Sequence, residues 1–241
     1  MLLIDGDIIA YRIAWSCDEE TSSDYAKTSC DTFVSNVLLT YQGMTTGYQL
    51  YLTGKGNFRH DYAVTAPYKG NRKSRPPPKY LQDIRQHLIE KWSALVVEGE
   101  EADDAIAIDA TTLGDYAVMA SIDKDFDQIP DIHYDFIKDE EYYVGEVEGL
   151  KFFYQQIITG DAIDNIIGVD GIGKQGAMDL IQGCRNEMDM WDIVRDQLGD
   201  DRALENARLC WLRREAGQIW EPPTTRSNKE VWYGEATSTT H

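Results

Sequence analysis

Four separated clusters of carboxylates constrain how this chain can fold, because each follows an apolar run of strand length or lies on or beside a predicted helix. Carboxylates gathered in one cleft repel one another, and burying an uncompensated charge is costly. A fold that brings the clusters together therefore needs divalent cations, and oxygen ligands favour hard ions, Mg²⁺ or Mn²⁺ before Zn²⁺. The clusters are Asp5 and Asp7; Glu101, Asp103 and Asp104; Asp123 and Asp125; and Asp161 and Asp164.

Short apolar runs alternate with helical spacing through the first 150 residues. This alternation predicts an α/β fold with a mostly parallel central sheet flanked by helices, whose active edge lies at the carboxyl ends of the strands. Asp5, Glu98 and Asp123 stand at such ends. The predicted strands are 1–5, 48–54, 93–99, 117–122 and 133–137, and the predicted helices are 8–15, 30–42, 79–92 and 100–114.

Beyond residue 150 the pattern changes to helices alone, including one over 201–216. Gly171-Ile172-Gly173 separates two helical stretches and predicts a tight hairpin whose amides point outward at a helix N-terminus, an arrangement that binds phosphate. We therefore predict a core over 1–150, an all-helical module over 151–216 and a C-terminal tail over 217–241.

The charge of the chain is unevenly distributed. The formal net charge is −19, and residues 98–170 hold 20 Asp and Glu against three Lys. Residues 55–85 instead hold eight Lys and Arg against two Asp. This basic segment includes Lys69, Arg72, Lys73 and Arg75; it predicts a phosphate-binding region, with Tyr68 as a surface on which a base can stack. The ordinary alternative for a charge run is a solvated loop.

The carboxylates also have structural interpretations. Asp7 is placed to cap the helix that follows it, and either Asp161 or Asp164 can cap a helix starting near Ala162. Acids at the start of the 100–114 helix suit the positive end of its dipole. Glu101 and Asp104, three residues apart, share a face of that helix.

Composition indicates a globular protein of a reducing cytoplasm. Hydrophobic residues make up 42% of the 241, and no apolar run approaches the roughly 18 residues that a membrane span needs. The start of the chain is too short and acidic for a secretory signal. The four cysteines have neither disulfide nor zinc spacing.

Five segments of the chain carry a resemblance to a known family; they are LIDGD, LTGKGNFRHDYAVTAPYKGNRK, EGEEADDAIA, SIDKDFDQIP and GDAIDNIIGVDGIGKQGA. Together they resemble the flap endonuclease and 5′–3′ exonuclease family, and especially its compact phage enzymes. The resemblance runs from residue 2 to about 185 and implies a metal-dependent nuclease core similar to the PIN fold. It further implies a helical arch over about 66–92 and a helix-three-turn-helix module that grips duplex DNA.

The resemblance also implies roles for individual residues. Many relatives carry an Asp at the end of the second strand, where this chain reads Leu52-Thr53-Gly54-Lys55. The implied first metal site is Asp5, Glu101, Asp103 and Asp104, and the second is Asp123, Asp125, Asp161 and Asp164. The implied catalytic cations are Lys69 and Arg72, and the implied backbone ligands of a K⁺ ion are Val169 and Ile172. The expected DNA contacts are Arg59, Tyr68, Lys73, Arg75, Gly171, Gly173 and Lys174.

The implied activity is that of a structure-specific 5′ nuclease. Two Mg²⁺ ions about 4 Å apart, or Mn²⁺ in their place, would activate water for in-line attack and leave 5′-phosphate products. The expected partner is DNA with a free 5′ end, flap or nick, with RNA primers and replication proteins as further partners. We expect a monomer in the cytoplasm, the host's if a phage encodes it.

Two alternatives remain open at this stage. A catalytically weak protein that binds DNA structures is motivated by the missing Asp near Thr53. An aspartyl-phosphate phosphatase is motivated by Asp5-Gly6-Asp7 after a strand, although such enzymes usually have Thr or Val where this chain has Ile9.

Overall fold

The chain forms two compact units, which are described separately. The computed structural model describes residues 1–74 and 76–224. The first unit contains Met1–Phe58, Lys73–Gly145 and Leu212–Gln218, and the second contains Arg59–Arg72, Glu146–Trp211 and the residues from Ile219. The chain therefore passes between the units several times, one passage lying close to the boundary predicted near residue 150.

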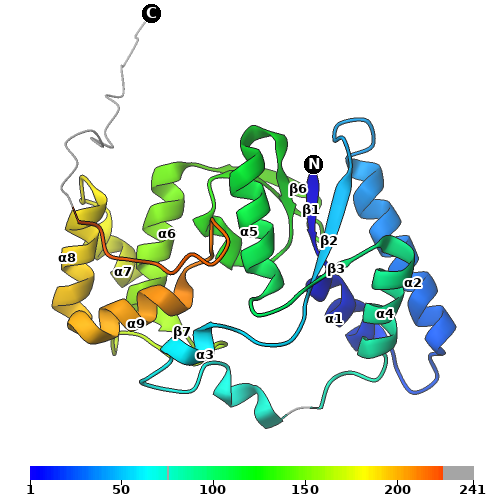
Figure 1. Ribbon diagram of the computed structural model, residues 1–241, viewed down its shortest axis with the longest axis horizontal. Helices are drawn as coiled ribbons and strands as arrows, with labels where there is room; N and C mark the ends of the chain where they lie inside the picture. The colour runs from blue at the N-terminus through cyan, green and yellow to red at the C-terminus, as the bar shows by residue number, and fades with distance from the viewer. Residues whose placement is uncertain (75, 225–241) are drawn as a thin grey trace, which may run out of the picture. The chain divides into compact units, whose positions relative to one another are not determined.

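A six-stranded sheet organises the first unit (Figure 1). The strand order is β3-β2-β1-β4-β5-β6, and all neighbours pair in parallel except β5 and β6. The predicted α/β fold with a mostly parallel sheet is confirmed, with β6 as an added antiparallel edge. The strands are β1 Leu2–Asp5, β2 Tyr48–Thr53, β3 Leu95–Val97, β4 Val118–Ala120, β5 Asp131–Asp135 and β6 Glu140–Val144.

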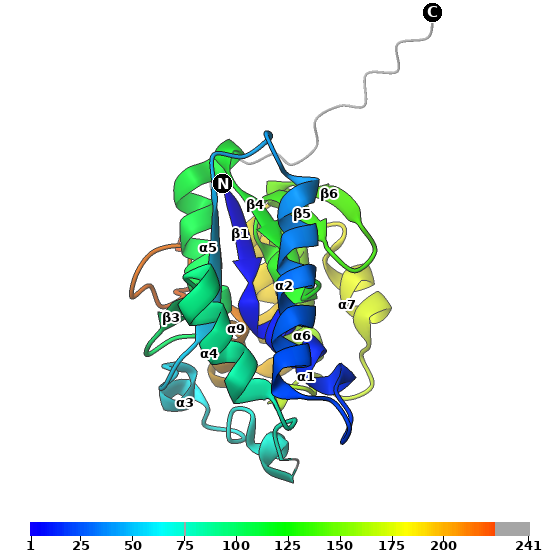
Figure 2. The ribbon, with the colours of Figure 1, turned by 90° about the vertical axis from the view of Figure 1, so that its right-hand side faces the viewer.

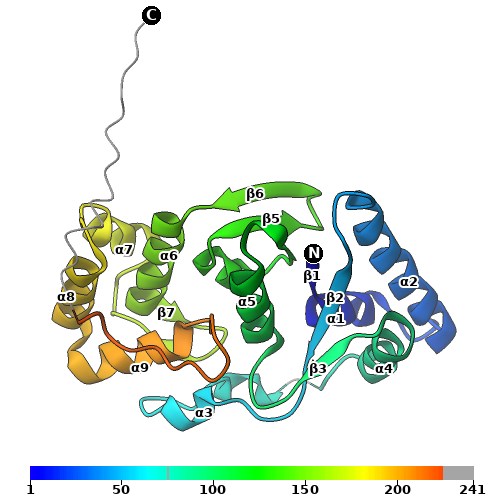
Figure 3. The same ribbon diagram turned by 45° about the horizontal axis from the view of Figure 1, so that its top comes forward.

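Helices cover both faces of this sheet. α1 (Gly6–Ser16), α2 (Ser23–Thr40) and α4 (Leu81–Trp92) lie on one side of the strands and α5 (Ala102–Leu113) on the other (Figures 2 and 3). Successive strand side chains point to opposite faces, so Leu2 and Ile4 pack with the first group of helices and Leu3 packs with α5. Covered faces explain why Leu2, Leu3 and Ile4 of β1 are apolar without alternation. Short 3₁₀ helices span Gly114–Tyr116 and Lys124–Gln128.

The segment predicted as an arch divides between the units. Residues 66–72 belong to the second unit, where a 3₁₀ helix begins at Gly70 and runs to Ser74. α4 belongs to the first unit, and Ile84 and Leu88 on it are fully buried against the sheet. α4 is thus a core helix, and a role of this region in selecting a single strand stays a prediction.

The second unit is helical around an aromatic core. Phe153 and Ile157 of α6, Val194 of α8 and Ala207 of α9 are fully buried in it, and the Trp220 ring lies 5.8 Å from that of Phe153. The helices are α3 Arg59–Tyr62, α6 Glu146–Thr159, α7 Lys174–Ile181, α8 Glu187–Leu198 and α9 Asp200–Cys210, with a hairpin of β7 Gly160–Asp161 and β8 Ile166–Ile167.

Two predicted helices differ from the structure. The helix expected over 201–216 ends at Cys210, because Leu212–Gln218 belongs to the first unit. The helix expected near Ala162 is a turn between β7 and β8. Gly160 has φ +64°, and a side chain there would collide with the carbonyl of Ile166, so this turn requires glycine. In the described part of the chain no helix is long and apolar enough to cross a membrane.

Because both faces of the sheet are buried, we expect truncation of a β1 side chain to lower the free energy of unfolding substantially. Ile4→Ala removes a fully buried side chain, so we expect it to lower the free energy of unfolding by about 2–5 kcal/mol. Urea denaturation followed by circular dichroism measures this. Leu39→Ala, at a side chain that is 61% exposed, is the control and should change stability by less than about 1 kcal/mol. If both substitutions changed the free energy of unfolding by the same small amount, the assignment of Ile4 to the core would be contradicted.

Candidate active site

The carboxyl ends of β1 and β4 are joined through a serine. Asp5 ends β1 and is only 2% exposed. One of its oxygens accepts the Ile8 amide at 3.0 Å, which makes Asp5 the N-cap of α1, and the other accepts the Ser121 hydroxyl at 2.8 Å. The Ser121 hydroxyl also accepts the Asp123 amide at 3.0 Å. Asp5 and Asp123, from separate sequence clusters, therefore meet at one edge of the sheet.

The buried position of Asp5 changes its acidity. Burial, together with repulsion from Asp7 and Asp123, raises the pKa of Asp5 to about 7, against the opposing hydrogen bonds from Ile8 and Ser121. Its charged form is thus poorly compensated by the protein alone.

The start of α5, also in the first unit, carries further candidate acids. Asp104 is fully buried, and its carboxylate accepts the Glu101 amide at 3.2 Å and the Arg213 amide at 3.1 Å. Asp103 is half-buried in the first turn of this helix. The Asp123 carboxylate accepts the amide of Asp125 at 3.0 Å. These acids serve as helix and turn caps as well as candidate ligands.

The donor set of the first unit fits a hard divalent cation. All its donors are carboxylate oxygens, the ligands that Mg²⁺ and Mn²⁺ prefer. A cation would also offset the repulsion that Asp7 and Asp123 exert on buried Asp5. Among the described residues, no three Asp, Glu, His or Cys side chains are gathered around one metal position, and Mg²⁺ is often bound through one or two carboxylates with water completing its shell.

In the second unit, Asp164 gathers the predicted catalytic cations. Its carboxylate, largely buried, accepts the Tyr68 hydroxyl at 2.7 Å and the Arg72 guanidinium at 2.5 Å, and the Lys69 ammonium lies 3.6 Å away. The Lys69 amide also donates to the Asp164 carbonyl at 2.8 Å. Asp161 accepts the Ile163 amide at 2.6 Å and so shapes the turn. Whether Asp161 and Asp164 join the acids of the first unit stays a prediction.

Two expected DNA contacts are structural instead. Tyr68 is 4% exposed and packs in the core of the second unit, so the stacking surface predicted there is wrong. Arg59 is 2% exposed and donates to the carbonyls of Leu209 at 2.9 Å and Trp211 at 2.7 Å. Neither side chain can reach a nucleic acid in this arrangement. The sequence gives no sign of this, because both residues lie in a segment that reads as exposed and basic.

The remaining predicted DNA contacts are exposed or lie outside the described residues. Gly171, with φ +74°, Gly173 and Lys174 are all exposed at the start of α7. The Val169 carbonyl accepts the Ile172 amide at 3.3 Å, and the predicted K⁺ site there stays a prediction. Arg75 and the side chain of Lys73 lie outside the described residues.

Sequence reasoning assigned Asp7 wrongly and missed two arginines. Asp7 lies in the first turn of α1 and does not cap it; its carboxylate pairs with Arg85 of α4 and accepts the Thr53 amide at 2.8 Å. Arg213 donates to Glu100 at 2.7 Å, and its guanidinium lies 3.6 Å from the centre of the Phe58 ring. No local pattern marks Arg213, because it lies beyond the recognised segments.

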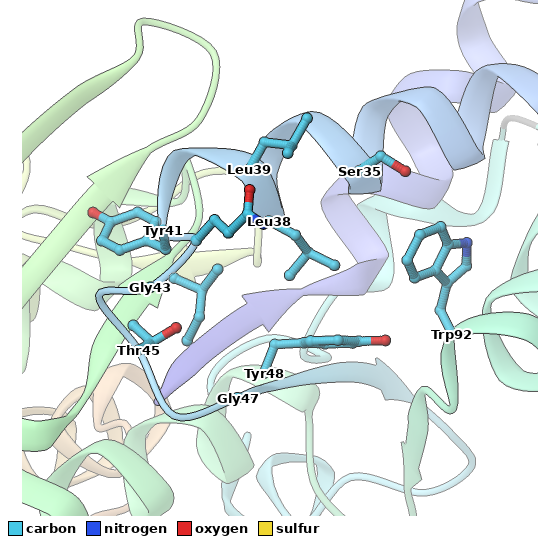
Figure 4. Close-up of a pocket in the computed structure, with 11 residues that line it drawn as sticks. Ser35, Leu38, Leu39, Tyr41, Gly43, Thr45, Gly47, Tyr48 and Trp92 are labelled. Carbon is cyan, nitrogen blue, oxygen red and sulfur yellow. The ribbon is translucent and has the colours of Figure 1, made fainter.

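An apolar cavity of about 450 Å³ lies away from these acids. Leu38 and Tyr41, from the end of α2, line it together with Tyr48 and Trp92 (Figure 4). Tyr48 begins β2, so the cavity is at the amino end of that strand, whereas Asp5 marks the carboxyl end of β1. The cavity is therefore not part of the carboxylate site.

Comparison with known proteins agrees with the sequence resemblance. DNA polymerase I of Pseudomonas aeruginosa is 31% identical over 76% of this chain and 22% of its own length. Flap endonuclease Xni of Shewanella piezotolerans is 32% identical over 58% of this chain and 60% of its own length. This chain is a homologue of flap endonucleases. It spans less than two thirds of either relative, and no protein-family model matches it.

Solved structures of such nucleases share the fold. The T5 D15 protein co-crystallised with metal ions superposes with a TM-score of 0.69 at 20% identity, over 87% of this chain and 88% of that one. The T5 D15 flap endonuclease in a pseudo-enzyme–product complex with DNA and metal ions gives 0.67 over the same shares. These structures show that the fold is shared, and the relatives named above bear out the predicted resemblance to flap endonucleases.

The environment of Asp5 predicts an unusual pH dependence of stability. The unfolded chain loses this proton near the ordinary pKa of 3.8, whereas the folded chain keeps it up to about 7. Wild-type stability therefore falls as pH rises through that window. Asp5→Asn, which preserves the helix cap, should be more stable than wild type by roughly 1–4 kcal/mol at pH 8 without metal. The gain should vanish near pH 4.

The measurement is urea unfolding of both proteins between pH 4 and 8 in chelator-treated buffer. Asp24→Asn is the matched control, because Asp24 lies in the first turn of α2 and is exposed. A pH-independent difference between Asp5→Asn and wild type would contradict the raised pKa.

Proposed function

We propose that this chain is a structure-specific 5′ nuclease that hydrolyses DNA phosphodiesters with divalent metal ions. The observation that carries the proposal is the meeting of buried Asp5 with Asp123 through Ser121 at the carboxyl edge of the sheet. Relatives named flap endonuclease and a fold shared with a T5 complex containing DNA and metal ions support it.

The acids would bind the metal and need not act as bases. The ligands in the first unit would be Asp5, Glu101, Asp103, Asp104, Asp123 and Asp125, and those in the second would be Asp161 and Asp164. Bound Mg²⁺, or Mn²⁺, would supply Lewis acidity and a water of lowered pKa. Asp5 would hold its position because the Ile8 amide and the Ser121 hydroxyl fix both carboxylate oxygens.

Lys69 and Arg72 would contact the phosphate whose bond is cut. Asp164 holds both cations at one place, and the Arg72 side chain is 50% exposed. An ammonium carries three donors and a guanidinium five, and charged donors of this kind are those that bind phosphate oxygens most strongly. Cations fixed in advance stabilise charge that develops in the transition state without reorganisation.

The exposed turn before α7 would hold the DNA backbone. Gly171 and Gly173 present amides there, and Lys174 adds a charge. Such contacts to phosphate are independent of sequence. In this proposal the carbonyls of Val169 and Ile172 bind K⁺, and the substrates are flaps, nicks or free 5′ ends, including those of RNA primers.

Cleavage of a 5′-labelled flap duplex in Mg²⁺ tests the proposal. Asp123→Asn should slow cleavage by about 100-fold or more, because a charged group that positions the reacting centre is lost. Asn can still accept the Asp125 amide, so the local turn is kept. The matched control is Asp115→Asn, at an exposed acid, which should cleave at the wild-type rate.

The outcome of this assay, together with flap binding in Ca²⁺ and hydrolysis of small phosphomonoesters, distinguishes the nuclease from its two alternatives. Binding of the flap in Ca²⁺ without turnover in Mg²⁺ would indicate a DNA-structure-binding protein. Hydrolysis of small phosphomonoesters with an intact flap would indicate a phosphatase. Either result would overturn the proposed nuclease activity.

Lys69→Ala tests the role of the cations separately from folding. We expect single-turnover cleavage about 10²–10³-fold slower, with flap affinity in Ca²⁺ changed much less. Lys138→Ala, at a side chain that is 61% exposed, is the control. Cleavage by Lys69→Ala at the wild-type rate would remove the role assigned to this residue.

A further inference from the structure

We propose that Glu205 of α9 is a positioning residue for Lys69. Glu205 lies in the second unit, beyond the segments that carry the family resemblance. The inference rests on the nuclease function proposed above, because Lys69 is assigned there to the phosphate. It concerns the contact that fixes the start of the loop on which Lys69 lies.

The Glu205 carboxylate binds the chain a few residues before Lys69. Glu205 is only 9% exposed. One of its oxygens accepts the amides of Val64 and Thr65, each at 2.7 Å, and the other accepts the Thr65 hydroxyl at 2.6 Å. Burying a charge is costly unless it is hydrogen-bonded, and hydrogen bonds to a charged acceptor are the stronger ones. Three donors from two consecutive residues therefore fix this point of the loop.

Few bonds can rotate between this anchor and Lys69. The chain reads Thr65-Ala66-Pro67-Tyr68-Lys69. The proline ring fixes the φ angle of Pro67 and biases Ala66 before it toward extended conformations. The Tyr68 side chain is packed in the core of the second unit. A shift of the backbone at Thr65 is therefore passed on to Lys69.

The backbone of Lys69 adopts a conformation that needs support from its surroundings. Its φ is +54°, in the left-handed region that residues other than glycine rarely occupy. The Lys69 amide donates to the Asp164 carbonyl at 2.8 Å, and the Lys69 carbonyl accepts the Arg72 amide at 3.1 Å. Such a conformation persists only where the neighbouring structure holds the chain in place. Glu205 provides such a contact on the N-terminal side of Lys69.

The same helix also holds the hairpin that carries Asp164. Asp164 lies in the turn between β7 and β8. Next to Glu205 on α9, the Asn206 side chain is 3% exposed and donates to the Ile167 carbonyl of β8 at 3.0 Å. α9 thus fixes the hairpin of Asp164 through Asn206 and the loop of Lys69 through Glu205. One rigid element therefore sets the position of the ammonium relative to the carboxylate that lies 3.6 Å from it.

Amide hydrogen exchange, resolved by residue with NMR, tests this coupling without any substrate. Glu205→Ala should speed exchange at Val64 and Thr65 and, because the loop is stiff, should also speed exchange of the Lys69 amide by about tenfold or more. Glu205→Gln keeps an oxygen that can accept both loop amides, so exchange at Lys69 should stay close to that of wild type. Glu148→Ala, at an exposed acid of α6, is the control. Unchanged exchange of the Lys69 amide in Glu205→Ala would overturn the proposal.

Single-turnover cleavage of the 5′-labelled flap in Mg²⁺ tests the consequence for the reaction. Glu205→Ala should cleave about 10–100-fold more slowly than wild type, because a displaced group loses much of its effect on the transition state. Its affinity for the flap in Ca²⁺ should change much less, and Glu205→Gln should recover most of the rate. Urea unfolding of each variant shows whether the fold is kept.

A double-variant cycle separates positioning from a general structural role. In a protein that already carries Lys69→Ala, Glu205 has no ammonium left to position, so Glu205→Ala should slow cleavage further by less than about threefold. A further loss as large as the one in the wild-type background would overturn the proposal, because the two residues would then act independently.

The outcomes distinguish this inference from the function on which it rests. Glu205→Ala that cleaves the flap as fast as wild type overturns the role of Glu205 and leaves the nuclease proposal standing. A wild-type protein that leaves the flap intact overturns both.

Discussion

The burial of a carboxylate at the end of a parallel strand is the constraint around which the first unit is built. Asp5 is 2% exposed and is repelled by Asp7 and Asp123. The protein offsets this with the Ile8 amide and the Ser121 hydroxyl, and Arg85 of α4 pairs with Asp7. These contacts position the acids but leave charge uncompensated, which is the condition under which a divalent cation binds strongly.

The second unit is also organised by a buried carboxylate, and there its neighbours are cations. Asp164 is largely buried, and it organises two cations, Lys69 and Arg72, at the surface. A loop that would otherwise be a flexible basic run is thereby fixed by its bonds to one acid. A chain with a net charge of −19 thus holds two positive side chains together at one place.

Several acids proposed to bind metal in the first unit also have structural roles. Asp5 caps α1, Asp104 accepts amides from Glu101 and Arg213, and Asp123 accepts the amide of Asp125. Capping holds a carboxylate at a defined position, because its oxygen is bound to a rigid helix or turn. Preorganisation of this kind is what a metal or phosphate site requires.

The sequence by itself determined the α/β fold, the strands of the parallel sheet and the acids at their ends. It could do so because alternation, periodicity and strand ends are local properties of one element. Only the tertiary structure decided that Asp5 meets Asp123 through Ser121, that Asp7 reaches β2, and that Arg59 and Tyr68 are buried. Asp7 meets Arg85 across 78 residues, and such meetings depend on how whole elements pack, which no local pattern records.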